Sequence, residues 1–397
     1  MRALPKLLLV TCHRWPNPPL MAHALVRAGW SVGLLGPWRQ PGRLMGGLDF
    51  VASHNVLNRE AGVVSAFAAW QPDLLVPCDD SAAALLHRLR PRAGAAVARC
   101  ITRSLGGEAE VETVLCKSRF VERAAALGLR VPPSAIVADR SALPAALAVV
   151  GLPCMVKRDE SWGGAGVARA ASPAEAAAAL ARFSAPPGWA QVLRGVLLQQ
   201  DLSLLRDRLR FRPPGLALQA MMPGSAVNRA VLCWQGQVLA GLTIEALATL
   251  PQNGPASVVR EISHAGIAEA CAHMVAALGL SGFVGFDFML DAAGEAHLIE
   301  LNPRVTPACT LLVRRGEAVA APLRAALAGE APSAAVPDEP APAPHVLFPQ
   351  ELQRDPGSDW LRRPAHQVPW EEPRLVRWCI DNALRLGRQA RRRAASA

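Results

Sequence analysis

The sequence predicts an α/β protein of more than one domain. Short apolar strands alternate with helices over roughly residues 1–95, which is the pattern of a parallel sheet covered by helices. Beyond residue 216, β-prone runs joined by tight turns indicate antiparallel strands. The chain has 397 residues, 51% of them apolar, enough for two or three domains with sizeable cores.

The N-terminal region begins with a continuous apolar strand over 6–11, of the kind that is buried on both faces of a parallel sheet. The loop that follows it contains no G-x-G-x-x-G, so the phosphate-binding glycines of a dinucleotide fold are missing. Asp79 and Asp80 precede a helix expected over 81–89. They either cap that helix or face a cleft.

Two lysines stand out in the middle of the chain, because only three of the 42 basic residues are lysines. Lys117 lies inside a helix expected over 111–129. Lys157 ends a strand expected over 152–157, and a glycine-rich turn follows it. A lysine at a strand end beside such a turn offers a compact positive charge to phosphate oxygens.

Further elements follow from capping and turn signals. A capping box with proline at the first helical position predicts a helix over 172–183. A strand is expected over 216–222, a hairpin over 231–244, and a helix over 267–278 that ends at a glycine.

The stretch from Gly282 to Arg304 carries most of the chemical information, and it is predicted to form two strands joined by a tight turn. The two-residue period of a strand places Glu300 and Asn302 on one face, and strand pairing can bring Asp287 onto it. Two carboxylates and an amide oxygen suit a hard cation such as Mg²⁺. Arg304 adds a planar guanidinium that suits a phosphoryl oxygen. The alternative is a hairpin held by a carboxylate–arginine salt bridge.

The series Asp287…Glu300-Leu301-Asn302-Pro303-Arg304 resembles the metal-binding signature of the ATP-grasp ligases, the superfamily of biotin carboxylase and the carbamoyl-phosphate synthetase large chain. The resemblance implies an α/β fold that is α+β in its ATP-grasp part. It implies a Rossmann-like domain over 1–105, then an ATP-grasp domain over 106–330 with a lid subdomain at about 150–220.

Beyond the resemblance, residues 331–345 are rich in Ala and Pro and are expected to form a linker. A C-terminal extension with a basic tail occupies 346–397. Its tryptophans predict that part of it packs on the rest of the molecule, and its basic end is typical of a solvated helix terminus.

The resemblance also assigns nucleotide contacts. It places phosphates against the two lysines and a flexible glycine-rich lid, and adenine against the backbone and apolar side chains of a hinge strand. The alternatives are an exposed helix lysine, a plain loop and methionines of the core. Gln219 stands where the family usually has an acid, which puts its ribose or adenine contact in doubt. The residues implied are Lys117, Lys157, Gly163, Gly164, Gly166, Gln219, Ala220, Met221 and Met222.

The metal ligands that the resemblance implies are Asp287, Glu300 and Asn302. They would hold Mg²⁺, expected as two ions, with Mn²⁺ as a substitute. Asp287 is shorter than the glutamate or glutamine common at this position. Arg304 and Lys157 are the expected catalytic residues, since both would stabilise charge on the transferred phosphoryl group.

The implied reaction is ATP-dependent ligation of a carboxylate to an amine, or less often a thiol, through an acyl-phosphate, with release of ADP and phosphate. Phosphoryl transfer without ligation and non-catalytic nucleotide binding are the alternatives. Asn228, Arg229 and Arg260 are candidates to hold a substrate carboxylate, or else they form surface salt bridges.

Composition narrows the classes of partner. The net charge of +10 is partly a C-terminal cluster of arginines, without the aromatic residues of a nucleic-acid groove, so nucleic-acid binding is not expected. Nine cysteines without a C-x-x-C pair argue against a zinc site or a disulfide framework and suit a cytoplasmic protein. No apolar run is long enough to span a bilayer. The expected partners are small-molecule carboxylates and amines, and a homodimer is left open.

Overall fold

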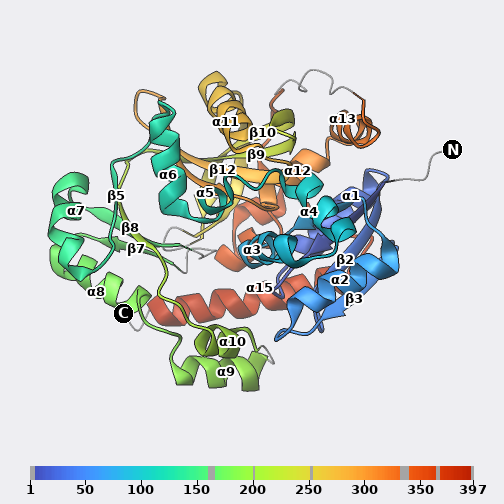
Figure 1. Cartoon of the computed structure of the whole chain (residues 1–397), viewed down its shortest axis with the longest axis horizontal. Helices are drawn as coiled ribbons and strands as arrows, with labels where there is room; N and C mark the ends of the chain where they lie inside the picture. The colour runs from blue at the N-terminus through green and yellow to red at the C-terminus, as the bar shows by residue number, and fades with distance from the viewer. Residues whose placement is uncertain are drawn as a thin grey trace.

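Three sheets organise the computed structural model of the chain (Figure 1). A parallel sheet lies near the N-terminus, a small antiparallel sheet lies at the opposite side of the molecule, and a large antiparallel sheet lies between and above them. The structure describes residues 5–159, 166–199, 202–250, 254–330, 339–363 and 367–394.

The parallel sheet has the strand order β3-β2-β1-β4, and strands β1, β2 and β4 are mostly apolar and buried. Apolar strands buried on both faces require helices on each side, and four helices supply them. The elements are β1 (Lys6–Val10), α1 (Asn17–Arg27), β2 (Ser31–Pro37), β3 (Phe50–His54), α2 (Arg59–Trp70), β4 (Leu74–Pro77), α3 (Asp80–Leu89) and α4 (Ala95–Leu105).

The small sheet has the order β5-β8-β6-β7 and is antiparallel throughout. Its apolar face packs against α7 and α8 around a core that includes Val156, Leu180 and Leu218. Ser172 is the N-cap of α8, as predicted, and its hydroxyl accepts from Glu175 N at 3.2 Å, but Glu175 Oε2 accepts from Ala171 N rather than from Ser172 N, so the capping box is only half formed. The elements are β5 (Ser134–Ile136), α7 (Leu143–Val150), β6 (Cys154–Arg158), β7 (Val167–Ala170), α8 (Pro173–Phe183), α9 (Trp189–Gln199), α10 (Ser203–Leu209) and β8 (Leu216–Ala220).

The large sheet has the order β13-β12-β9-β10-β11-β14, with α5, α6 and α11 among the elements packed on it. One continuous core joins it to the parallel sheet, since Leu7, Leu232 and Leu312 belong to the same buried cluster. The strands are β9 (Ser225–Trp234), β10 (Gln237–Thr249), β11 (Ala256–Ile262), β12 (Gly282–Leu290), β13 (Ala296–Asn302) and β14 (His345–Val346). The helices are α5 (Val111–Leu115), α6 (Lys117–Ala126), α11 (Ala265–Leu278), α12 (Pro307–Val313), α13 (Glu317–Leu327), α14 (Gln350–Arg354) and α15 (Pro373–Ala394), and the short 3₁₀ turns are Pro41–Leu44, Arg90–Arg92, Arg140–Ala142 and Asp359–Arg362.

The prediction of a single helix over 111–129 is wrong. The chain forms α5 and α6 instead, separated at Cys116, whose backbone is extended with φ −104° and ψ 113°. Asp159, at the end of β6, accepts hydrogen bonds from Ser118 N at 3.2 Å and Ser118 Oγ at 2.9 Å. This carboxylate caps the new helix start, so a contact from another sheet favours the break.

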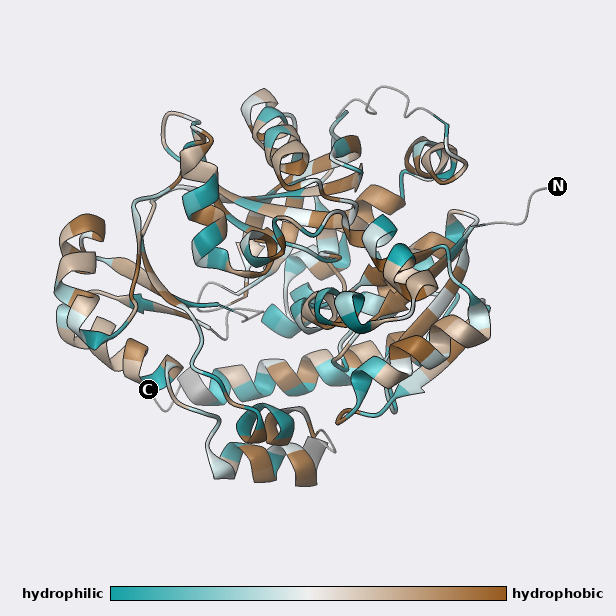
Figure 2. Cartoon of the chain, in the orientation of Figure 1, coloured by the Kyte–Doolittle hydropathy of each residue, from teal (hydrophilic) through white to brown (hydrophobic). Residues whose placement is uncertain are grey.

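The C-terminal segment packs on the molecule, as its tryptophans predict. The helix α15 crosses the lower side of the view in Figure 1, and Figure 2 shows apolar and polar residues alternating along it. Leu375 and Cys379 are fully buried, and Trp378 packs against the core, whereas Trp370 is exposed. Of the expected linker, residues 331–338 lie outside the described residues, while His345 belongs to β14. Within the described ranges, no helix combines the length and apolar character that crossing a bilayer requires.

Candidate functional site

Strand register brings three polar side chains into one row across the large sheet. On β12, Asp287 pairs with Asn228 of β9 on one side and with Glu300 of β13 on the other. Directly paired residues of antiparallel strands point to the same face, and residues two apart along a strand do so as well. Asn302 therefore shares this face with Glu300.

Asp287 lies at the centre of a hydrogen-bond network. Its Oδ1 accepts from Asn228 Nδ2 at 2.6 Å and its Oδ2 from Asn302 Nδ2 at 2.8 Å. Burial, together with the charge of Glu300, raises the pKa of Asp287 to about 6. A carboxylate only accepts hydrogen bonds, so both amides turn their nitrogen toward it and their oxygen away.

The two amide oxygens meet different fates. Asn302 Oδ1 accepts from Arg304 Nη2 at 2.9 Å. Asn228 Oδ1 is buried and has no hydrogen-bond partner among the residues that the structure describes. Such an atom costs folding about 1–3 kcal/mol, and buried polar atoms of this kind often mark a place for a ligand.

Both internal lysines converge on Glu300. Lys117 Nζ lies 3.1 Å from Glu300 Oε2, so Lys117 is not the exposed helix lysine of the alternative interpretation. Burial alone would raise the pKa of Glu300, but Lys117 and Lys157 outweigh it and lower that pKa to about 2. Lys157 is 9% exposed, and burial lowers its pKa. Glu300 is thus held ionised, whereas burial of Lys157 disfavours the charged form of this lysine.

Arg304 joins this network to the parallel sheet. Its Nε donates to Asp80 Oδ2 at 2.9 Å, from the start of α3. Asp79 is instead the cap of α3, accepting from Ala82 N at 2.8 Å, and it also accepts from Thr11 Oγ1 at 2.7 Å. The helix-cap alternative is therefore realised by Asp79, whereas Asp80 pairs with Arg304.

These residues suit a hard cation. The oxygen donors are Asp287, Glu300 and two amides, which matches the preference of Mg²⁺ for carboxylate and amide oxygens. The described part of the chain contains no group of three or more His, Cys, Asp or Glu side chains that could hold a metal, so an ion here needs the amides as well. The unpartnered Asn228 Oδ1 shows that the network has acceptor capacity to spare.

The strand expected to act as the hinge, β8, lies between β5 and β6 in the small sheet. Gln219 is buried, and its Nε2 donates to Ser134 Oγ at 3.2 Å. After Ala220, Met221 is 42% exposed and Met222 half-buried, so the interpretation of both methionines as core residues is wrong. This exposure leaves Met221 accessible to a planar ligand.

The glycine-rich turn is described only at its edges. Gly163 and Gly164 lie outside the described residues. Gly166 closes the base of the β6–β7 hairpin, where its carbonyl accepts from Arg158 N at 2.8 Å. Lys157 precedes this base directly, on the same hairpin.

Of the three residues considered for a substrate carboxylate, only Asn228 lies on the site face. Arg229 follows it on β9, points to the opposite face, and donates to Thr243 Oγ1 at 2.6 Å. Arg260 forms a salt bridge with Glu245, with Nη2 and Oε2 2.6 Å apart. The surface salt bridge is thus the observed arrangement for Arg260.

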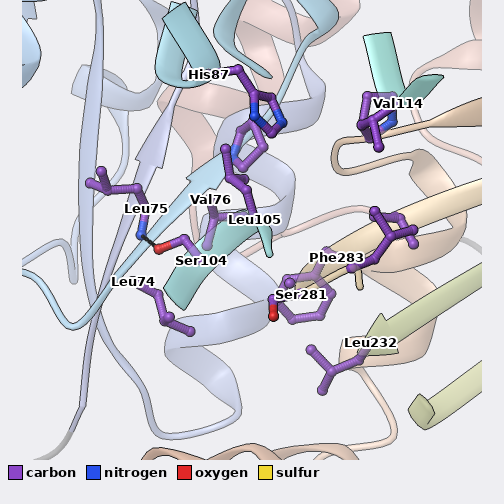
Figure 3. A pocket seen from close by; sticks show the side chains of 15 residues that line it. Leu74, Leu75, Val76, His87, Ser104, Leu105, Val114, Leu232, Ser281 and Phe283 are labelled. Atoms are coloured by element: carbon purple, nitrogen blue, oxygen red, sulfur yellow. Dashed lines mark hydrogen bonds between the residues drawn. The ribbon is translucent and has the colours of Figure 1, made fainter. Parts of the chain in front are cut away.

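A cavity lies near the network but is too small for a nucleotide. Its volume is about 10 Å³, the room of one water molecule. Figure 3 shows it between β4, α4 and the start of β12, with His87, Leu105 and Phe283 among its lining residues. Burial lowers the pKa of His87 to about 4, so its ring is neutral at pH 7.

Comparisons with known proteins agree with this geometry. Residues 222–308 match the sequence profile of the family described as the ATP-grasp domain. No curated protein sequence matches the chain.

Solved structures share the fold at low identity. The biotin carboxylase domain of 2-oxoglutarate carboxylase from Hydrogenobacter thermophilus gives a TM-score of 0.57 at 16% identity, over 81% of this chain and 70% of that chain. N5-carboxyaminoimidazole synthetase from Staphylococcus aureus, complexed with ADP, gives 0.55 at 13%, over 85% and 79%. L-amino acid ligase from Bacillus licheniformis gives 0.53 at 15%, over 82% and 75%. Residues 222–308 thus match the ATP-grasp domain family, and the solved structures show that the chain shares their fold, so the expected fold class is confirmed.

Proposed function

We propose that this protein is an ATP-dependent ligase that joins a carboxylate to an amine through an acyl-phosphate. One observation carries the proposal: Asp287, Glu300 and Asn302 share one face of the large sheet, and Lys117 and Arg304 are bonded to them. That constellation combines oxygen ligands for a cation with positive groups for phosphates, which is what phosphoryl transfer requires.

In this proposal Asp287, Glu300 and Asn302 hold Mg²⁺, which when bound neutralises phosphate charge and orients the transfer. Mn²⁺ is a substitute. Two ions are proposed on charge grounds. The site's three carboxylates balance its three cationic groups: they are Asp80, Asp287 and Glu300 against Lys117, Lys157 and Arg304. A ligand whose total charge is close to zero therefore enters this site with the smallest electrostatic penalty. A nucleoside triphosphate with two bound divalent cations is such a ligand.

The remaining steps use this chain's own groups. Lys117 and Lys157 bind phosphate oxygens, while Ala220, Met221 and Met222 line the adenine, with Gln219 behind them. The lid at 160–167, which includes Gly163, Gly164 and Gly166, closes over the phosphates in this proposal and excludes water. Arg304 stabilises charge on the γ-phosphoryl group as the substrate carboxylate oxygen attacks its phosphorus and ADP departs. The amine nitrogen then attacks the activated carbonyl carbon, phosphate leaves, and the nitrogen loses a proton.

The relatives support this reaction class through their printed descriptions. One is complexed with ADP, one is complexed with MgADP and bicarbonate, and one is an L-amino acid ligase. We further propose the division into domains at 1–105, 106–330 and 346–397, with the lid subdomain formed by the small sheet. Phosphoryl transfer without ligation is the second candidate, because the same residues would carry the first step alone.

A screen for ADP release tests the proposal. Purified protein is given Mg-ATP and a panel that crosses carboxylates, bicarbonate included, with amines, and products are identified by mass spectrometry. Hydroxylamine then replaces the amine, since it traps an acyl-phosphate as a hydroxamate. Ligation predicts an amide and a hydroxamate. A stable phosphorylated product would favour the phosphotransferase, and tight ATP binding without ADP release across the panel would favour a non-catalytic module.

A further inference from the structure

One oxygen on the β9 side of Asp287 has no partner among the described residues. Asn228 Nδ2 donates to Asp287 Oδ1 at 2.6 Å, while Asn228 Oδ1, at the other end of the same amide, is buried and makes no hydrogen bond within the described part of the chain. Turning the amide over would set oxygen against carboxylate oxygen, so the orientation is fixed. Asn228 Oδ1 therefore presents an acceptor to anything that enters, which excludes a substrate carboxylate or a phosphate oxygen as the partner of this oxygen.

The surroundings favour a cation as that partner. Glu300, Asp287 and Asn228 stand opposite one another on three adjacent strands, with Asp287 in the middle. Neighbouring side chains in such a row have Cβ atoms about 4.5–5.5 Å apart. The row is thus wide enough for two divalent ions, which in two-metal sites lie about 3.5–4 Å apart.

The other amide of the network is less well placed to serve both ions. Asn302 lies at the Glu300 end, on β13, and its oxygen already accepts from Arg304 Nη2 at 2.9 Å. Asn228 lies at the opposite end of the row, across Asp287. An ion on the β9 side would therefore have a carboxylate oxygen of Asp287 and the oxygen of Asn228 as its nearest protein ligands.

We propose that Asn228 Oδ1 is a ligand for a divalent cation on the β9 side of Asp287, and that Asn228 thereby belongs to the ion site. This inference rests on the proposed function, which brings the cation in with the nucleotide. It gives Asn228 a role that neither the sequence motif nor the profile match assigns.

The experiment measures Mn²⁺ binding rather than turnover. Mn²⁺ is titrated into the full-length protein with a non-hydrolysable β,γ-imido ATP analogue, and free Mn²⁺ is followed by electron paramagnetic resonance. Asn228→Leu removes the oxygen at similar volume, and Asn228→Asp keeps an oxygen but removes the donor to Asp287. Gln237→Leu, an exposed amide in the same hairpin, is the matched control, and Glu300→Gln reports on the site itself. Thermal melting verifies that each variant is folded.

The proposal predicts that Asn228→Leu weakens Mn²⁺ binding at one of two sites by at least about tenfold. Asn228→Asp should bind as tightly as wild type or more tightly, and Gln237→Leu should match wild type. If Asn228 only holds Asp287 in place by donating to it, Asn228→Asp will lose as much affinity as Asn228→Leu, which overturns the inference. Unchanged binding in Asn228→Leu also overturns it, as would a single Mn²⁺ site.

The proposed function fails separately. If wild type binds no Mn²⁺ with the nucleotide, or if Glu300→Gln binds it as wild type does, the whole cation site is wrong and the inference falls with it. If Glu300→Gln loses Mn²⁺ while Asn228→Leu does not, only the role of Asn228 is refuted.

Discussion

Two acid-centred clusters lie on the same large sheet, and they differ in whether all their polar groups have partners. Glu261 on β11 has both carboxylate oxygens satisfied. Oε1 accepts from His345 Nε2 at 2.9 Å, and Oε2 accepts from Arg315 Nη2 at 2.8 Å and from Ala341 N at 2.7 Å. Burial acts against the charge, but these donors prevail and lower the pKa of Glu261. This cluster fastens the C-terminal segment to the sheet.

The cluster on β12 and β13 is organised differently. The pKa of Asp287 is raised to about 6 and that of Glu300 is lowered to about 2, so the pKa values of these two neighbouring acids differ widely. A buried lysine with a lowered pKa and an amide oxygen without a partner accompany them. In a cluster with a structural role, each charged group has its full set of partners. In a cluster that binds a ligand, some groups keep shifted pKa values and some acceptors stay without a donor until the ligand enters.

The sharpest way to separate the two clusters is to neutralise one acid in each. Glu300→Gln should reduce ADP formation by about a hundredfold or more, because it removes a carboxylate that acts on the transferred phosphate through the cation. Glu261→Gln is the matched control and should retain nearly full activity. The measurement is ADP release with a substrate identified by the screen. Full turnover by Glu300→Gln would show that the cation assignment is mistaken.

The two lysines of the site extend the comparison to the nucleotide. Lys157→Met should weaken binding of a non-hydrolysable ATP analogue by about 10–100-fold, since a charge-assisted hydrogen bond contributes roughly 1.5–3 kcal/mol. Calorimetry with and without Mg²⁺ measures this. The loss should appear in both conditions, unlike that of Glu300→Gln, which should appear only with Mg²⁺. Lys6→Met, on β1, is the control, and an equal loss there would contradict a specific role for Lys157.

Asp80 tests whether the site depends on the parallel sheet. Asp80→Asn keeps the shape but removes the charge that holds Arg304 Nε at 2.9 Å. We expect kcat to fall by about tenfold through misplacement of Arg304, with little change in nucleotide affinity. Steady-state kinetics and calorimetry together check this split. An equal loss in nucleotide affinity would instead make Asp80 a general support of the cleft.

The smallest expected effect concerns stability at the Glu261 cluster. Glu261→Gln should lower the free energy of unfolding at pH 7 by about 1–3 kcal/mol, since the ionised acceptor of three donors is lost. The folded-state pKa of Glu261 lies below its ordinary value of 4.5, so the contribution is present above that value and fades as pH falls through the folded-state pKa. Urea unfolding at pH 7 and at acid pH measures the gap between variant and wild type. A gap that widens in acid would contradict the account.

Local patterns predicted some of the site and missed the rest for an identifiable reason. Turn chemistry and the two-residue period are properties of a short segment, and they predicted the β12–β13 hairpin that carries Asp287, Glu300 and Asn302. The pairing of Asn228 with Asp287 joins residues 59 apart, and that of Asp80 with Arg304 joins residues 224 apart. No local pattern records such pairings.

The failures at helix and linker boundaries have the same origin. Residues 111–129 have the periodicity of one helix, yet Asp159 of a different sheet caps a second start after Cys116. Ala/Pro composition predicted a linker through 345, yet contacts of Glu261 with Ala341 and His345 draw its end into the large sheet. In both cases a distant carboxylate decides the local structure.

The central claim is that acids of the large sheet bind the divalent cation that accompanies ATP, and that the two lysines bind the ATP phosphates. A crystal structure with Mg²⁺ and a non-hydrolysable ATP analogue tests it most directly. The account predicts Mg²⁺ bonded to oxygens of Asp287, Glu300 and Asn302, with Lys117 and Lys157 on phosphate oxygens. Nucleotide bound elsewhere, or Mg²⁺ contacting none of these three side chains, would contradict it.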